Sequence, residues 1–256
     1  MGYQDRNQQF DDCNGNYSNY GDYHQDDMGS LTVAQAPAAT RASFMVQTYL
    51  HLVGAILLFV GIEMIFFSSE TIVGLAASVL QSGRLAWLGI MVLFVGAAAL
   101  ANRLAYSDQS PMVQYLGLAL YAFIEAVIFL PLLLLAMMFA PEAIPQAAWA
   151  TAIIFGLLSV AVFITRANFS FLRTGLLFGT FALVAIIIAS MLFGFQISGI
   201  ITWVGIALAC GYILYDTSNV IHAYQPGQHV AAALALFASV MLLFWYVLRL
   251  FILRRD

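Results

Sequence analysis

Apolar stretches alternate with short polar breaks along the chain from about residue 44 to its C-terminal end. At 1.5 Å per residue, each stretch is long enough as a helix to cross a hydrocarbon core about 30 Å thick. The pattern predicts seven transmembrane helices, at about residues 44–67, 85–102, 112–138, 147–165, 171–193, 197–221 and 230–253. A short polar break, SSETIVG (68–74), follows the first of them.

Prolines agree with most of these boundaries. Because proline stops a helix or is tolerated only in its first turn, four of them are expected in or beside the breaks: Pro111, Pro141, Pro145 and Pro226. Pro131 instead falls inside the third predicted helix, where it predicts a kink.

Residues 1–42 differ from the rest of the chain, since the first 30 are rich in Asn, Gln, Asp, Gly and Tyr and almost lack aliphatic residues. Such a segment buries too little apolar surface to offset the entropy of ordering, so we expect disorder. It also lacks the basic and apolar regions of a signal peptide. The tail is either a solvated leader or a Tyr-rich docking segment for a partner. In either case we expect a seven-helix transmembrane domain to follow it, over residues 43–256.

Composition places the chain among membrane proteins with several crossings, since 62% of its residues are hydrophobic and 9% are charged. All nine basic residues are arginine, and no basic patch suggests nucleic-acid binding. Seven crossings put five arginines on the side of the N-terminus: Arg6, Arg41, Arg103, Arg166 and Arg173. The other side has three: Arg84, Arg254 and Arg255. We therefore expect a cytoplasmic N-terminus, and the lack of Lys and the polar tail suggest a bacterial inner membrane.

Ionisable residues within membrane spans are costly and mark candidate functional sites. Those in the predicted helices are Glu63, Glu125, Asp216 and Arg249, with His51 as a weaker candidate. From their depths, Arg103 and Asp216 are expected to form a salt bridge near the cytoplasmic face, and Glu63 and Arg249 a second pair. Glu125 lies near mid-depth without an obvious cation, so it is either protonated or faces water.

On the sixth predicted helix, Tyr212, Asp216 and Asn219 follow i, i+4, i+7 spacing and share one face. A polar stripe that includes a carboxylate suits a cation pathway or a proton-sensitive latch. It equally suits a network of hydrogen bonds that fixes helix packing.

Enzymatic alternatives are weaker. His222 and His229 flank AYQPGQ, a poor spacing for chelating a metal, and we interpret them as surface loop residues. Intramembrane aspartyl proteases need two aspartates, whereas only Asp216 lies in a predicted span, and no hydrolase or phosphate-binding motif occurs. We expect no enzymatic activity and no resident cofactor.

The stretch GYILYDTSNVIH (211–222) resembles the sixth-helix signature of the Bax inhibitor-1 family, also called the transmembrane Bax inhibitor motif family. Supporting resemblances are TYLHLVGAILL (48–58), ALYAFIEAVIFLPLL (119–133) and 150–179, so that the likeness covers about 44–253. It implies an all-α membrane protein in which six helices surround a central seventh. Members resemble pH-sensitive calcium leak channels; eukaryotic ones suppress cell death, and some bacterial ones bind a membrane-bound ATP-dependent protease.

The resemblance also implies site residues. Asp216 matches the family's sixth-helix aspartate, which interacts with Ca²⁺, and Arg103 is placed to act as its latch. The family's second aspartate, with which the first shares a proton, falls on Ser239. Ser239 can donate a hydrogen bond to Asp216 but cannot share its charge, so weak or acid-shifted pH gating is expected. Two hypotheses remain: a Ca²⁺ pathway through Asp216 and Glu125, or a non-conducting regulator of a membrane protease or another partner.

Overall fold

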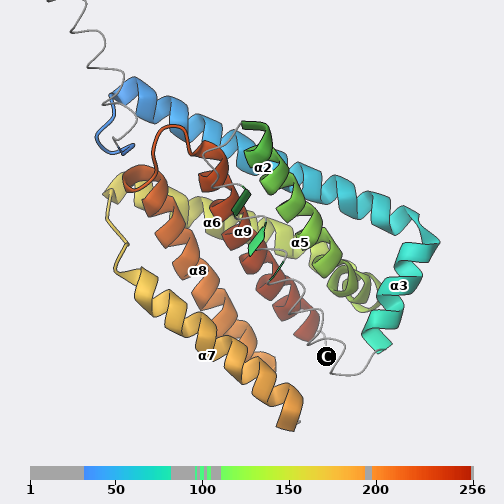
Figure 1. Ribbon diagram of the computed structural model, residues 1–256. Coiled ribbons are helices and arrows are strands. Elements are labelled where there is room, and N and C mark those ends of the chain that lie inside the picture. Colours follow the sequence, from blue (N-terminus) through green and yellow to red (C-terminus); the bar gives the residue numbers. More distant parts are fainter. Residues whose placement is uncertain are drawn as a thin grey trace, which may run out of the picture.

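The computed structural model describes residues 32–81, 96, 99–100, 103–104, 111–193 and 198–254 (Figure 1). Helices account for all regular structure in these ranges: α2 (Ala38–Ser68), α3 (Glu70–Gln81), α5 (Pro111–Phe139), α6 (Ala143–Thr165), α7 (Leu172–Phe193), α8 (Ser198–His222) and α9 (His229–Leu253). Within them, every helix except α3 is long and apolar enough to span a membrane. Six of the predicted spans are thereby confirmed, while most of the second, 85–102, lies outside the described residues.

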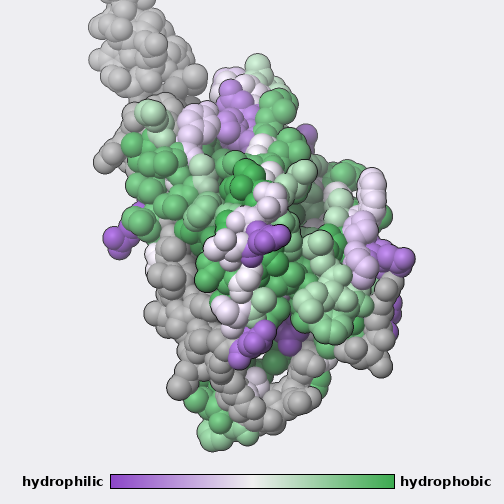
Figure 2. Space-filling view, turned by 90° about the vertical axis from the view of Figure 1, so that its right-hand side faces the viewer, coloured by the Kyte–Doolittle hydropathy of each residue, from purple (hydrophilic) through white to green (hydrophobic). Residues whose placement is uncertain are grey.

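Large apolar side chains are exposed along these helices, as expected for surfaces that face lipid tails. Examples are Leu57 of α2, Ile153 of α6 and Phe178 of α7, which are 65%, 58% and 68% exposed. Figure 2 shows one such face, on which hydrophobic residues cover most of the coloured surface and hydrophilic residues lie in separate patches, one of them near its middle. The surface and the helix lengths together are those of a protein that crosses the membrane several times.

The polar break at SSETIVG does end α2, but this stretch also contains the start of a further helix that the pattern does not predict. Ser69 is extended between α2 and α3, with φ −105° and ψ 111°, and Glu70 opens α3. Ala76 of α3 is buried in one cluster with Leu130 and Leu134 of α5. Polar residues at 68–70 mark the end of α2, and the apolar residues after them form a short helix that packs on α5.

The predicted tail boundary at residue 42 is too late. Helix α2 begins at Ala38, and the residues before it lie against the connection between α8 and α9. Val33 is fully buried and its N–H donates to the carbonyl oxygen of Tyr224 at 2.8 Å. Tyr224 also lies against Phe44, with ring centroids 6.5 Å apart. Packing of the chain therefore begins by Val33, and the predicted disorder of 1–31 lies outside the described residues.

Prolines fall mainly at helix starts. Pro111 opens α5, Pro145 lies in the first turn of α6, and Pro226 lies in the turn before α9. The backbone N–H groups in the first turn of a helix have no hydrogen-bond acceptor within the helix. Proline, which has no N–H, is therefore tolerated there. Helix α5 continues through Pro131, and the kink expected there stays a prediction.

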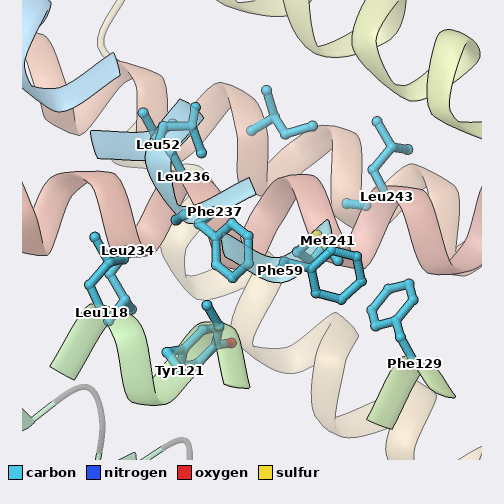
Figure 3. Close-up of a cluster of buried hydrophobic side chains, with 14 of the residues drawn as sticks. Leu52, Phe59, Leu118, Tyr121, Phe129, Leu234, Leu236, Phe237, Met241 and Leu243 are labelled. Atoms are coloured by element: carbon cyan, nitrogen blue, oxygen red, sulfur yellow. The ribbon is translucent and has the colours of Figure 1, made fainter. Parts of the chain in front are cut away.

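Helix α9 is the centre of the described bundle. It packs against α2, α5, α6 and α8, and 72% of its most apolar 18 residues are buried, against at most 44% in the other spans. Its buried side chains point to all sides, as in Figure 3, where Leu236, Phe237 and Met241 lie among residues of α2 and α5. A helix that is apolar all round is expected to be buried.

Aromatic contacts join α9 to its neighbours. Phe129 of α5 lies 5.3 Å from Phe59 of α2, 5.5 Å from Phe244 and 5.1 Å from Trp245 of α9, measured between ring centroids. Tyr121, two turns earlier on α5, makes an edge contact with Phe237. Lipid tails are as apolar as these side chains, so shape and close packing, rather than exclusion of water, hold the helices together.

Helices α8 and α9 approach closely at Gly205. A Cβ atom added there would lie 2.5 Å from three ring atoms of Tyr246 on α9. Between α7 and α8, a Cβ on Gly179 or Gly211 would similarly lie 2.7 Å from a leucine side chain. Small residues let membrane helices pack at short distances, and these glycines set the positions of α7 and α9 against α8.

We expect Gly205→Ala to destabilise the protein by about 1–3 kcal/mol, because the added methyl group overpacks the contact with Tyr246. Thermal unfolding in one detergent would measure this as a lower Tm. Gly156→Ala in α6 is the matched control, since no atom lies within 4 Å of its added Cβ. Equal Tm values for the two variants would contradict close packing at Gly205.

Candidate functional site

A cavity of about 680 Å³ lies beside α9 and contains several of the polar residues that the sequence singles out. Helices α5, α7, α8 and α9 each contribute to its wall, which is mainly apolar. Its ionisable and hydroxyl-bearing residues include Tyr121, Glu125, Tyr212, Asp216, Ser239 and Arg249. The helical register of the four elements thus brings together two carboxyl groups and a guanidinium that are far apart in sequence.

Asp216 is the most constrained of these groups. It is 8% exposed, and the Ser239 hydroxyl of α9 donates a hydrogen bond to its Oδ2 atom. The hydrogen bond that the sequence predicts between these two residues is therefore present. A buried carboxylate without donors would cost several kcal/mol, so Ser239 offsets part of the cost of placing Asp216 inside the bundle and joins α8 to α9.

Glu125 lies in the same cavity and is 6% exposed. Tyr121, one turn earlier on α5, has its hydroxyl within hydrogen-bonding reach of the Glu125 carboxyl and also interacts electrostatically with Asp216. Tyr121 therefore lies near both acids. Its role is missed from the sequence, although its i, i+4 spacing to Glu125 is a signal that could have indicated it.

The predicted salt bridge between Arg103 and Asp216 is not formed. Arg103 is exposed whereas Asp216 is buried, and no salt bridge joins them in the described part of the chain. Similar depth in the membrane was the basis of the expected pair, but depth does not determine which way each side chain points around its helix.

The second predicted pair, Glu63 with Arg249, is also wrong. Glu63 of α2 is 6% exposed, and neither of its carboxyl oxygens has a hydrogen-bond partner in the structure. Arg249 lies instead at the cavity, where it interacts electrostatically with Tyr246. The cation expected near the outer end of α2 thus belongs to the same cavity as Asp216 and Glu125.

The polar residues of α8 bond to different elements, although Tyr212 and Asp216 both line the cavity. Tyr212 shares a hydrogen bond of 2.8 Å with the Thr180 hydroxyl of α7. The Ser218 hydroxyl donates to the carbonyl oxygen of Ala167 at 3.2 Å and accepts from the N–H of Phe169 at 3.0 Å, which holds the connection between α6 and α7. Asn219 does not contribute to the cavity. The structural alternative for the predicted face therefore applies to Tyr212, while Ser218, two positions after Asp216, lies on another side of α8.

For a bound cation, the cavity offers oxygen atoms from carboxyl and hydroxyl groups. Ca²⁺ prefers such ligands and takes six to eight of them, some from water. Within the described ranges, Asp216 is not part of any group of three or more His, Cys, Asp or Glu side chains close enough to hold a metal ion together. The arrangement suits transient coordination by Asp216, Ser239 and water rather than a closed cage.

We expect Ser239→Ala to destabilise the protein by about 1–3 kcal/mol, because it removes the donor to a buried carboxyl group. Denaturation monitored in detergent would measure the change. Ser190→Ala in α7 is the matched control, since its hydroxyl bonds only within its own helix, to the carbonyl oxygen of Ile187. A loss of stability no larger for Ser239→Ala than for Ser190→Ala would show that this hydrogen bond contributes little.

Comparison with known proteins agrees with this architecture. A family model described as "Inhibitor of apoptosis-promoting Bax1" matches residues 41–256. The Golgi anti-apoptotic protein of vaccinia virus (strain Lister) is 32% identical over 91 residues, or 34% of this chain and 37% of the relative. Protein lifeguard 4 of Mus musculus is 38% identical over 45 residues, or 18% of this chain and 19% of the relative.

These matched segments span less than two fifths of either relative, whereas the family model covers every described helix except the first residues of α2. The relatives come from a virus and a mammal, and the bacterial origin suggested by composition stays a prediction. The family resemblance that residues 211–222 carry is confirmed, since the family model matches residues 41–256. This chain belongs to the Bax inhibitor-1 family, the inhibitors of apoptosis-promoting Bax1.

Proposed function

We propose that this multi-pass membrane protein lets Ca²⁺ pass through its bundle along the cavity beside α9. The observation that carries this proposal is the pair of buried carboxyl groups, Asp216 and Glu125, which line one cavity between four helices. Carboxyl groups within a membrane are costly and mark ion pathways. A structural hydrogen bond to Ser239 accounts for one oxygen of Asp216 but requires neither the cavity nor Glu125.

The extent of the cavity supports a path along the axis of α9. Ser239 and Arg249 both line it and lie ten positions apart on that helix, which corresponds to about 15 Å at 1.5 Å per residue. That is about half of the hydrocarbon thickness. We infer that Asp216 and Ser239 attract the ion at the inner end of this half-path and that Glu125 lines the route.

In this proposal the pH response differs from that of a shared-proton pair. Ser239 is uncharged, so titration of Asp216 is not coupled to a second acid at position 239. Glu125 is the other carboxyl group in the cavity, and Tyr121 interacts with both acids. Any coupled titration that gates the flux would therefore involve Asp216 and Glu125.

We expect Asp216→Asn to reduce Ca²⁺ influx into proteoliposomes by about tenfold or more between about pH 5 and pH 8, because a lost attraction of only about 1.4 kcal/mol gives that factor. Glu63→Gln is the matched control: it also neutralises a buried membrane carboxyl group, but Glu63 does not line the cavity. Influx that is unchanged by Asp216→Asn would rule out the pathway. Absence of influx above empty liposomes would leave a regulator as the function.

Arg249 is the cation that competes with Ca²⁺ in this cavity. Its guanidinium lines the same space as the two acids, so a Ca²⁺ ion moving toward the C-terminal end of α9 has to pass it. We expect Arg249→Gln to raise Ca²⁺ influx several-fold by removing this repulsion. Arg103→Gln tests the latch suggested by the family: a rise with Arg103→Gln alone would assign the control of flux to Arg103 instead.

The second candidate is a non-conducting regulator, which is favoured by the names of the two relatives, an anti-apoptotic protein and a lifeguard protein. In this proposal the bundle is a scaffold, and the tail, in the cytoplasm of a bacterial cell, binds a membrane-bound ATP-dependent protease. Deleting residues 1–31 leaves Val33 and its contact with Tyr224 in place. Loss of protease binding with intact influx would favour a channel that carries a docking tail.

A further inference from the structure

A group of three polar rings lies outside the cavity, where the first turns of α5 and α9 meet α2. It consists of His51 of α2, Tyr115 of α5 and His229, the first residue of α9. The His51 ring lies 5.3 Å from the Tyr115 ring and 5.0 Å from the His229 ring, measured between centroids. The sequence interpretation of His229 as a surface loop residue is therefore wrong, because packing of α9 on α2 brings it against a second histidine.

His51 has a defined orientation and tautomer. Its Nδ1 atom lies 2.6 Å from the carbonyl oxygen of Gln47, one turn earlier. A carbonyl oxygen can only accept, so Nδ1 carries the proton and donates it. In the neutral ring Nε2 then carries no proton, and its lone pair accepts a hydrogen bond from the Tyr115 hydroxyl at 3.1 Å. Histidines that bind metals use this arrangement, with one nitrogen held by a carbonyl and the other directed at the ion.

His229 contributes a nitrogen atom without a hydrogen-bond partner. Its Nδ1 is shielded from solvent and has no partner in the structure, although buried ring nitrogens are normally paired. The two imidazole planes are tilted by 49° with centroids 5.0 Å apart. Two imidazoles that bind one tetrahedral zinc ion through bonds of about 2.0–2.1 Å have centroids about 5 Å apart, so the observed separation already fits a shared ion.

Both histidines are on fixed backbone at an accessible end of the bundle. Leu52 and Val230, their neighbours in sequence, are 2% and 1% exposed, and α2 packs directly against α9. His51 and Tyr115 also line a hollow of about 300 Å³ on the surface. Gln225 and Gly227, in the turn before α9, are exposed. An ion could thus reach the pair without crossing the apolar interior.

We propose that His51 and His229 form a binding site for a divalent transition-metal ion such as Zn²⁺, which links α2 to the start of α9. Imidazole nitrogens suit zinc and copper, whereas Ca²⁺ prefers oxygen, so the site is distinct from the Ca²⁺ pathway proposed above. No third His, Cys, Asp or Glu joins the pair among the described residues. Water completes the coordination, and the Tyr115 hydroxyl gives up Nε2 of His51 and donates to one of these waters.

Titration of the purified full chain with Zn²⁺ in detergent, followed by calorimetry, tests this site. We expect His51→Ala and His229→Ala each to weaken binding by about tenfold or more, since losing even an outer partner of a metal ligand costs 10–100-fold. His222→Ala is the matched control, because His222 bonds the carbonyl oxygen of Ser218 through Nδ1 at 2.9 Å and is not part of the pair. His24 of the tail is present in every variant and adds the same background.

Thermal unfolding separates loss of the site from loss of the fold. Zn²⁺ binds the folded state, so it should raise the Tm of the wild type and of His222→Ala but not that of His51→Ala or His229→Ala. His51→Phe and His229→Phe keep a ring at each position, and their Tm without Zn²⁺ should stay near that of the wild type. The proposal is overturned if the wild type shows no saturable Zn²⁺ binding above the tail background. It is also overturned if the variants at His51, or those at His229, bind Zn²⁺ like the wild type.

Discussion

The burial of α9 is the constraint on which the other features of the molecule depend. A helix can cross a membrane alone because its backbone hydrogen bonds are internal, but α9 is enclosed by α2, α5, α6 and α8. Enclosure requires small or closely fitting neighbours, such as Gly205 against Tyr246. It also determines which side chains of α9 meet the cavity, so that Ser239 reaches Asp216 and Arg249 lies along the same space.

Helix α8 shows how polar groups position a helix in an apolar surrounding. Asp216 bonds α9, Tyr212 bonds α7, and Ser218 bonds the connection between α6 and α7. Lipid offers none of these groups a partner, so rotating α8 would break several bonds at once. The same bonds that fix the helix also place one carboxyl group beside a cavity. Structure and candidate function therefore depend on the same residues, and a mutation at Asp216 has to be judged by both stability and flux.

Two regions at the N-terminal ends of α2, α5 and α9 add to this arrangement. Val33 bonds Tyr224, in the connection between α8 and α9, and His51 contacts His229 at the start of α9. The first contact joins the residues before α2 to the connection that leads into α9, and the second joins α2 to the first residue of α9. A ligand or partner that acts on this end would therefore act on the helix that also carries Ser239. His229 and Ser239 lie on this one continuous helix, ten positions apart.

The sequence by itself determined the spans, because runs of apolar residues long enough to cross a membrane depend on composition alone. It also located Asp216 and Glu125, since an ionisable residue in such a run is visible without coordinates, whereas Ser239 was located through the family resemblance. Only the tertiary structure decided the partners: Arg249 lies with the cavity acids rather than Glu63, Arg103 is apart from Asp216, and His229 meets His51. The reason is geometric. Sequence gives the depth of a residue along its helix, but the rotation of each helix, set by packing against its neighbours, decides which side chains meet.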